Sequence, residues 1–113
     1  MNKDRLTILW TNSDLITSEK MVFMYGIKAK LNNWWSEVTI VIWGATAKLA
    51  AENPMIQEKI KVALESGVRV SACKACAEQL GVTKTLESLG VEIIYWGEPL
   101  TEILKNEEKL LTI

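Results

Sequence analysis

Histidine is absent from this sequence of 113 residues. Because histidine is the usual general base near neutral pH, its absence excludes Ser-His-Asp and Cys-His catalysis within a single chain. Histidine is also the commonest zinc ligand, and the two cysteines supply only two of the four ligands that a structural zinc site needs. The sequence therefore predicts no metal site, unless two subunits share one.

Long apolar runs and blocks of one charge are also missing. The first apolar run, Leu6 to Trp10, is too short for the core of a signal peptide or for a membrane span. Thirteen basic residues face fourteen acidic ones, for a net charge of -1, and no basic block stands out. We therefore expect a cytoplasmic protein with reduced cysteines, and neither nucleic acid nor a membrane as its partner.

The composition is that of an ordinary globular domain, with 49% hydrophobic and 24% charged residues. A chain of this length is large enough to bury a core but too small to divide in two. No repeat, linker or low-complexity segment interrupts it. We expect residues 1–113 to form a single domain.

Short apolar segments alternate with helix-like segments along the chain. Strands that are apolar on both faces are typical of a parallel sheet held between helix layers, so this alternation predicts an α/β sandwich. The five strands are expected at Leu6–Trp10, Val38–Trp43, Val68–Ala72, Val91–Tyr95 and Lys109–Ile113.

The segments between these strands have the composition and end signals of helices. The first, Thr17–Asn33, contains Gly26, which costs about 1 kcal/mol relative to alanine unless it lets the helix approach the sheet closely. We expect that close approach. The apolar face of this helix is predicted to contain Met21, Met24, Tyr25, Ile27 and Leu31, and the later helices are expected at Ala47–Glu52, from Asn53-Pro54 to before Ser66, at Lys74–Leu80, Val82–Leu89 and Pro99–Asn106.

Both cysteines lie where a strand is expected to turn into a helix. Cys73 follows the strand Val68–Ala72, and Cys76 lies within the helix Lys74–Leu80, which Gly81 closes. Unpaired backbone N–H groups and the positive end of the helix dipole stabilise a thiolate, so we expect a lowered pKa for Cys73 and a better nucleophile there. Cys76 is close enough to act as a resolving partner.

Polar, aromatic and glycine residues follow several of the predicted strands. Ligands of parallel sheets bind at the carboxyl ends of the strands, which meet at one edge. We therefore expect Cys73 to lie near a group of candidate ligand-binding residues that follow the other strands, namely Asn12, Ser13, Trp43, Gly44, Trp96 and Gly97.

Other interpretations of these features remain open. Either cysteine could be only a small buried apolar side chain. A thioredoxin site is disfavoured, because neither Pro54 nor Pro99 precedes a strand as a cis-proline facing that site would. A flavodoxin-like phosphate site is also weakly supported, because the turn Thr11–Ser18 lacks glycine and Asp14 would repel a phosphate.

The tryptophans allow two interpretations. Trp10, Trp43 and Trp96 each close a strand, and they either form a dry wall around a reactive thiol or fill the ends of the core. Trp34 and Trp35 are adjacent at the end of the first predicted helix. Since they cannot both point inward there, one of them is a candidate for a subunit interface.

The order and spacing of several short motifs resemble those of the DsrE/DsrF-like family, which includes the sulfur-relay subunits of the Tus and Dsr systems. The motifs are Trp43-Gly44-Ala45, Gly67-Val-Arg-Val-Ser-Ala-Cys73, Leu80-Gly81-Val82 and Leu89-Gly90-Val91-Glu92. The resemblance implies a three-layer α/β/α sandwich around a five-stranded parallel sheet in the order 4-3-2-1-5. It also implies assembly into homotrimers or homohexamers.

In the sulfur-relay members, a cysteine at the position of Cys73 carries a persulfide that is passed between proteins. The resemblance thus implies a sulfur carrier with separate donor and acceptor proteins, and this chemistry requires no cofactor. Cys76 departs from that pattern, which leaves two alternatives. The protein is either a thiol-disulfide redox or sensing protein that uses Cys73 and Cys76, or a non-catalytic ligand or interaction module of the same fold.

Overall fold

The computed structural model describes residues 4–113 and contains one parallel sheet. Its strand order is β4-β3-β2-β1-β5, which confirms both the α/β class and the expected order. Every pair of neighbouring strands is parallel. The strands are β1 (Arg5–Trp10), β2 (Glu37–Ile42), β3 (Arg69–Cys73), β4 (Glu92–Ile94) and β5 (Lys109–Thr112).

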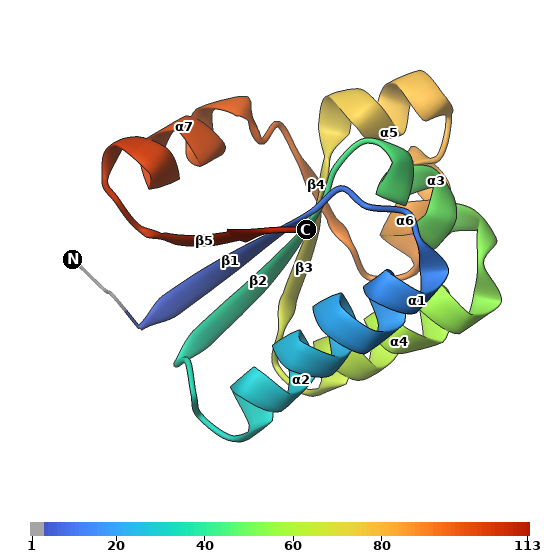
Figure 1. Ribbon diagram of the computed structural model, residues 1–113. Coiled ribbons are helices and arrows are strands. Elements are labelled where there is room, and N and C mark those ends of the chain that lie inside the picture. Colours follow the sequence, from blue (N-terminus) through green and yellow to red (C-terminus); the bar gives the residue numbers. More distant parts are fainter. Residues whose placement is uncertain (1–3) are drawn as a thin grey trace.

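Helices cover both faces of the sheet. Figure 1 shows α2 and α4 over one face and α7 over the opposite face, so the chain forms three layers. The helices are α1 (Leu15–Thr17), the π-helical segment η1 (Ser18–Phe23), α2 (Met24–Leu31), α3 (Ala45–Glu52), α4 (Pro54–Glu65), α5 (Lys74–Leu80), α6 (Thr83–Ser88) and α7 (Gly97–Lys105).

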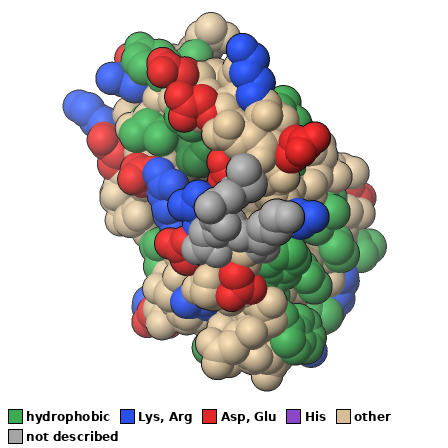
Figure 2. Space-filling view, turned by 90° about the vertical axis from the view of Figure 1, so that its left-hand side faces the viewer, with side chains coloured by type: hydrophobic (Ala, Val, Ile, Leu, Met, Phe, Trp, Pro, Cys, Tyr) green, Lys and Arg blue, Asp and Glu red, His purple; other side chains and the backbone are tan. Residues whose placement is uncertain are grey.

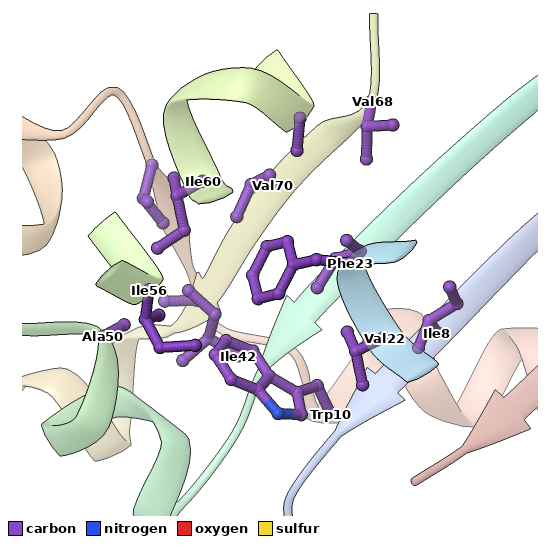
Figure 3. Packing of buried hydrophobic residues seen from close by; sticks show 14 of the residues in the cluster. Ile8, Trp10, Val22, Phe23, Ile42, Ala50, Ile56, Ile60, Val68 and Val70 are labelled. Carbon is purple, nitrogen blue, oxygen red and sulfur yellow. The ribbon is translucent and has the colours of Figure 1, made fainter. Parts of the chain in front are cut away.

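The main core lies between the sheet and the layer that contains α2 and α4 (Figure 3). Trp10, at the end of β1, is fully buried there and packs edge-on against Phe23, with 5.1 Å between the ring centroids. Its indole Nε1–H donates to Ser18 Oγ at 3.0 Å, so the polar atom of this buried ring is satisfied. Trp10 is therefore a core residue.

The predicted apolar face of the first helix was right only in part. Tyr25 and Ile27 pack against the core, but Met21, Met24 and Leu31 are exposed. The buried residues of this helix are Ser18, Val22, Phe23, Gly26 and Ala29. The prediction favoured large apolar residues and omitted the small ones that let the helix lie close to the sheet.

Gly26 shows how close this contact is. A Cβ atom at this position would lie 3.4 Å from the Cδ1 atoms of both Ile8 and Ile40, which confirms the expected close approach. The helix also ends at Leu31, so Trp34 and Trp35 lie in the loop before β2 and not on the helix. Trp34 is 56% exposed, while Trp35 is half-buried and donates from Nε1 to the Tyr25 hydroxyl at 3.0 Å.

The start of α4 confirms the predicted capping signal. Asn53 has extended backbone, its Oδ1 accepts a hydrogen bond from the Ile56 N–H at 3.0 Å, and Pro54 occupies the first helical position. Replacing Asn53 with alanine should lower the free energy of unfolding by about 1 kcal/mol, because this N–H loses its partner. Urea denaturation measures the change, with Asn106→Ala at the end of α7 as the control; equal stability of the two variants would contradict the assignment.

Residues 4–113 contain no helix that is both long and apolar enough to cross a membrane. Figure 2 shows one face of the molecule, on which basic and acidic side chains are interspersed. No block of a single charge is visible on that face.

Candidate functional site

Cys73 is the last residue of β3 and the N-cap of α5, which confirms that it lies at a strand-to-helix turn. Its side chain points to the sheet face that α7 covers, and only 5% of the residue is exposed. It packs with Val41 and Trp96 in a second hydrophobic cluster, separate from the main core. The thiol therefore lies in a dry environment.

Trp96 closes this second cluster. It is 3% exposed, and its Nε1–H donates to Ser71 Oγ at 2.8 Å, while Ser71 in turn donates to the Glu92 carbonyl at 3.0 Å. The Arg69 guanidinium lies over the indole, 5.4 Å from the ring centroid. Hydrogen bonding, stacking and burial thus fix the ring that covers Cys73.

The three strand-closing tryptophans therefore separate into two groups. Trp96 belongs to the cluster around Cys73, and Trp43, which is half-buried, packs against the same cluster. Trp10 lies in the main core instead. The aromatic wall around the thiol consists of two of the three candidates.

Cys76 is more accessible than Cys73, and the turn after β2 holds its sulfur. The Gly44 N–H donates to Cys76 Sγ at 3.4 Å. Gly44 has φ of +69°, a conformation that favours glycine, so this residue lets the turn direct its N–H toward the thiol. Gly44 and Cys76 therefore belong to one local unit.

Burial raises the pKa of the Cys76 thiol above its ordinary value. The hydrogen bond from the Gly44 N–H opposes this rise, whereas the neighbouring Cys73 adds to it through its hydrogen bond and its charge. Because a raised pKa means a smaller thiolate fraction, Cys76 is predominantly a neutral thiol near pH 7.

This environment predicts the pH dependence of alkylation at Cys76. The midpoint for labelling by iodoacetamide should lie above that of a free peptide with the sequence 74–80, because the folded site disfavours the thiolate. In Cys73→Ser the midpoint should fall, since the neighbouring thiol no longer raises the pKa. Mass spectrometry assigns the labelled residue, and a midpoint at or below that of the peptide would contradict the prediction.

A pocket of about 510 Å³ lies beside Cys76, between α3 and α5. Two of the predicted ligand-binding residues, Ser13 and Gly44, belong to its lining. Sequence reasoning missed the wall that α3 provides, although its side chains recur one helical turn apart directly after Gly44. The pocket is lined by Ser13, Gly44, Ala45, Lys48, Leu49, Glu52, Cys76, Gln79 and Leu80.

Four predicted ligand-binding residues do not line this pocket. Trp43 and Trp96 belong to the surroundings of Cys73 described above, and the other two are Asn12 and Gly97. The side chain of Asn12 accepts a hydrogen bond from the Asp14 N–H at 2.8 Å and supports the turn after β1. Gly97 is exposed at the start of α7. The Asp14 carboxylate accepts the Thr17 N–H and hydroxyl, both at 2.8 Å, so its pKa is lowered and it occupies the helix end that a phosphate would need.

A second pocket, of about 440 Å³, lies toward the amino ends of the strands. Many of its charges are paired, as in the contacts of Arg5 with Glu37 at 3.5 Å and with Glu108 at 3.2 Å. Trp96 belongs to its lining as well as to the cluster around Cys73. The indole therefore borders both this pocket and the cluster that contains the buried thiol.

No metal centre emerges from this arrangement. Within residues 4–113, no group of three or more histidine, cysteine, aspartate or glutamate side chains lies close enough to hold a metal ion. The site contains two free thiols, one of which is buried and one of which borders a pocket.

Comparisons with known proteins place the fold and the family. The protein BT1422 from Bacteroides thetaiotaomicron, described as a conserved protein of unknown function, is 43% identical with a TM-score of 0.95, and the match covers 97% of this chain and 95% of that one. The ychN protein from E. coli shares the fold, with a TM-score of 0.70, 17% identity and full coverage of both chains. No curated protein matches. The sequence profile of the DsrE/DsrF-like family matches residues 8–113, so the chain belongs to this family, which is associated with sulfur relay.

Proposed function

We propose that this protein carries sulfur as a persulfide on Cys73 and passes it to the thiol of a partner in a cytoplasmic relay. The observation that supports the proposal best is the burial of Cys73 beneath Trp96, beside a second thiol that borders a pocket. A persulfide is readily oxidised or reduced by small molecules in water. The dry cluster around Cys73 limits their access to the stored sulfur.

The transfer of sulfur between thiols requires no oxidant, because one S–S bond forms as another breaks. The accepting thiolate attacks the outer sulfur of the donor persulfide, a new S–S bond forms, and the donor leaves as a thiolate. The same exchange, with Cys73 as the leaving thiolate, passes the sulfur to an acceptor. The step uses neither a metal nor histidine.

Cys76 has a distinct part in this proposal. Because Cys76 borders the pocket and Cys73 is buried behind it, Cys76 accepts the sulfur first and hands its outer sulfur to Cys73. Cys76→Ser should therefore slow the loading of Cys73 by about tenfold or more, while the final persulfide content survives. Quenched time courses with inorganic polysulfide as the donor measure the rate, and unchanged kinetics would contradict this role.

The direct test of sulfur carriage is intact-mass and peptide mass spectrometry of the native protein after incubation with inorganic polysulfide and removal of excess donor. A gain of one sulfur atom mapped to Cys73 supports the proposal. Loss of two hydrogens with no added sulfur, mapped to the peptide that contains both cysteines, would replace it with disulfide chemistry. Absence of both products would leave the cysteines as core residues of a binding module.

A thiol-disulfide redox or sensing function is the second candidate. The observation that favours it is the proximity of the two thiols, which is close enough for Cys73 to raise the pKa of Cys76, since neighbouring thiols can form a disulfide. Cys76→Ser separates the two functions, because disulfide chemistry requires both sulfurs and persulfide storage requires only Cys73.

We also propose that the carrier works as a homotrimer or homohexamer with separate donor and acceptor proteins. Large apolar side chains exposed on and after the first helical segment support self-association, among them Ile16 at 71%, Leu31 at 60% and Trp34 at 56% exposure. Trp34→Lys should shift the assembly toward the monomer. Sedimentation velocity measures the distribution, with Tyr95→Lys as an exposed aromatic control outside this region.

A further inference from the structure

We infer that the pocket between α3 and α5 binds a zwitterionic low-molecular-weight persulfide, of an amino acid or short peptide, and presents its outer sulfur to Cys76. This inference rests on the proposed function and names the class of sulfur donor. Its basis is the combination of an apolar floor, a thiol and two opposite charges around one cavity.

The dimensions of the pocket suit a small peptide. Its volume of about 510 Å³ lies within the range of small-molecule sites, about 300–1,000 Å³. Ala45, Leu49 and Leu80 provide apolar surface for the carbon chain of the ligand, while Cys76 provides the reacting sulfur. A ligand held there has its own sulfur next to the accepting thiol.

The charges at the pocket suit a molecule that carries both signs. Lys48 and Glu52 lie one helical turn apart on α3, and both are exposed. Neither side chain forms an ion pair or a hydrogen bond with any residue in the range 4–113. The ammonium and carboxylate groups of an amino-acid or peptide thiol complement this pair, with the carboxylate at Lys48 and the ammonium group at Glu52.

Polar groups at the opposite wall complete the complementarity. Gln79 of α5 and Ser13 of the turn after β1 also line the pocket, and neither side chain has a hydrogen-bond partner in residues 4–113. An amide and a hydroxyl can bond the backbone of a peptide ligand. An apolar metabolite would leave all four polar side chains without a role in binding.

The transfer in the pocket is a thiol exchange in which one S–S bond forms and one breaks. The Cys76 thiolate attacks the outer sulfur of the bound persulfide, the S–S bond to the ligand breaks, and the ligand leaves as a thiolate that takes up a proton from water. Because the pKa of Cys76 is raised, loading should accelerate as the pH rises toward that pKa. The bound ligand supplies the proximity that offsets the small thiolate fraction.

Two measurements on the intact protein test the inference. The first is calorimetric titration with S-methylglutathione, a zwitterionic peptide thioether that cannot transfer sulfur. The second is the initial rate of Cys73 loading as a function of donor concentration, with glutathione persulfide compared with the persulfide of mercaptoethanol, which lacks ammonium and carboxylate groups. The variants are Lys48→Glu and Glu52→Lys, and Lys84→Glu on α6 is the matched control because it is exposed and outside the pocket.

The expected result is saturable loading by glutathione persulfide and measurable binding of S-methylglutathione. Lys48→Glu and Glu52→Lys should each weaken both by about fivefold, as expected for loss of one exposed ion pair, and Lys84→Glu should change neither. Loading by the mercaptoethanol persulfide should be the same in all variants.

The inference fails if S-methylglutathione does not bind, or if the pocket variants behave like Lys84→Glu. In that case, loading of Cys73 by inorganic polysulfide would still support sulfur carriage, with a protein as its donor. If S-methylglutathione binds but no donor places sulfur on Cys73, the pocket is a peptide site, and both the carrier function and the donor role are wrong.

Discussion

Cys73→Ser is expected to reduce the persulfide content of the protein to the background of a cysteine-free variant, whichever donor is used. Serine keeps the size and position of the side chain, but its hydroxyl does not form the nucleophile that accepts sulfur at neutral pH. Cys73 is the thiol buried in the cluster that contains Trp96, whereas Cys76 is partly buried and packs against this cluster. Without Cys73, any sulfur accepted at Cys76 remains beside the pocket, where donor thiols remove it.

The measurement is sulfur release by reductant after gel filtration, with Cys76→Ser as the matched control. Each variant removes one thiol of the same CxxC pair, so both retain one cysteine. A difference in their persulfide content therefore depends on which cysteine remains. Cys76→Ser should retain its final content. Retention of persulfide in Cys73→Ser, with loss in Cys76→Ser, would assign storage to Cys76 and overturn the proposed division of labour.

The proposed division rests on the different environments of the two cysteines, although they are only one helical turn apart. Cys73 ends β3 on the sheet face that α7 covers, whereas Cys76 faces the turn at Gly44 and the pocket beyond it. The CxxC spacing places them close together, and the surrounding elements determine which of them is accessible.

Much of the fold could be predicted from local sequence patterns. The apolar strands and the end signals at Asn53-Pro54 and Gly81 each concern a few neighbouring residues, and the structure agrees with them. The family resemblance supplied the strand order, which periodicity does not contain. The face of the first helix could be predicted only in part, because the close contact at Gly26 selects small residues that an apolar pattern of large side chains does not indicate.

The candidate site could also be predicted only in part from local sequence patterns. Its position at the carboxyl ends of the strands follows from topology, and that rule brought Ser13, Gly44 and Cys73 into consideration, while the CxxC spacing added Cys76. The helix-dipole argument for Cys73 used only local sequence, so it did not reveal the burial that Trp96 imposes from the following strand-to-helix connection. The Lys48 and Glu52 wall was missed because a short helix with exposed charges is usually only a solvated face.

Trp96→Ala is expected to lower the free energy of unfolding by about 3 to 5 kcal/mol and to expose Cys73. The indole is 3% exposed, and it borders both the cluster around Cys73 and the pocket of about 440 Å³ near the amino ends of the strands. Removing the ring is expected to connect that pocket with the thiol. Alkylation of Cys73 should accelerate and a stored persulfide should be lost faster; quenched labelling with mass spectrometry measures both rates.

Trp10→Ala is the control that separates local exposure from general loss of stability. Trp10 and Trp96 each follow or end a strand, each is buried, and each donates from Nε1 to a serine hydroxyl, but Trp10 lies on the opposite face of the sheet. A loss of about 4 kcal/mol raises the unfolded population roughly a thousandfold in either variant. Labelling through global unfolding therefore rises to a similar extent in both.

The labelling rates of Cys73 in Trp96→Ala and Trp10→Ala are compared after correction for the measured stability of each variant. A higher corrected rate in Trp96→Ala would show that the indole of Trp96 limits access to Cys73. If the alanine variants do not fold, Trp96→Phe and Trp10→Phe make the same comparison with smaller cavities. Equal labelling in a stability-matched pair would show that Trp96 does not control access to Cys73. The stored sulfur would then be protected by the fold as a whole, and sulfur would leave only along the path through Cys76.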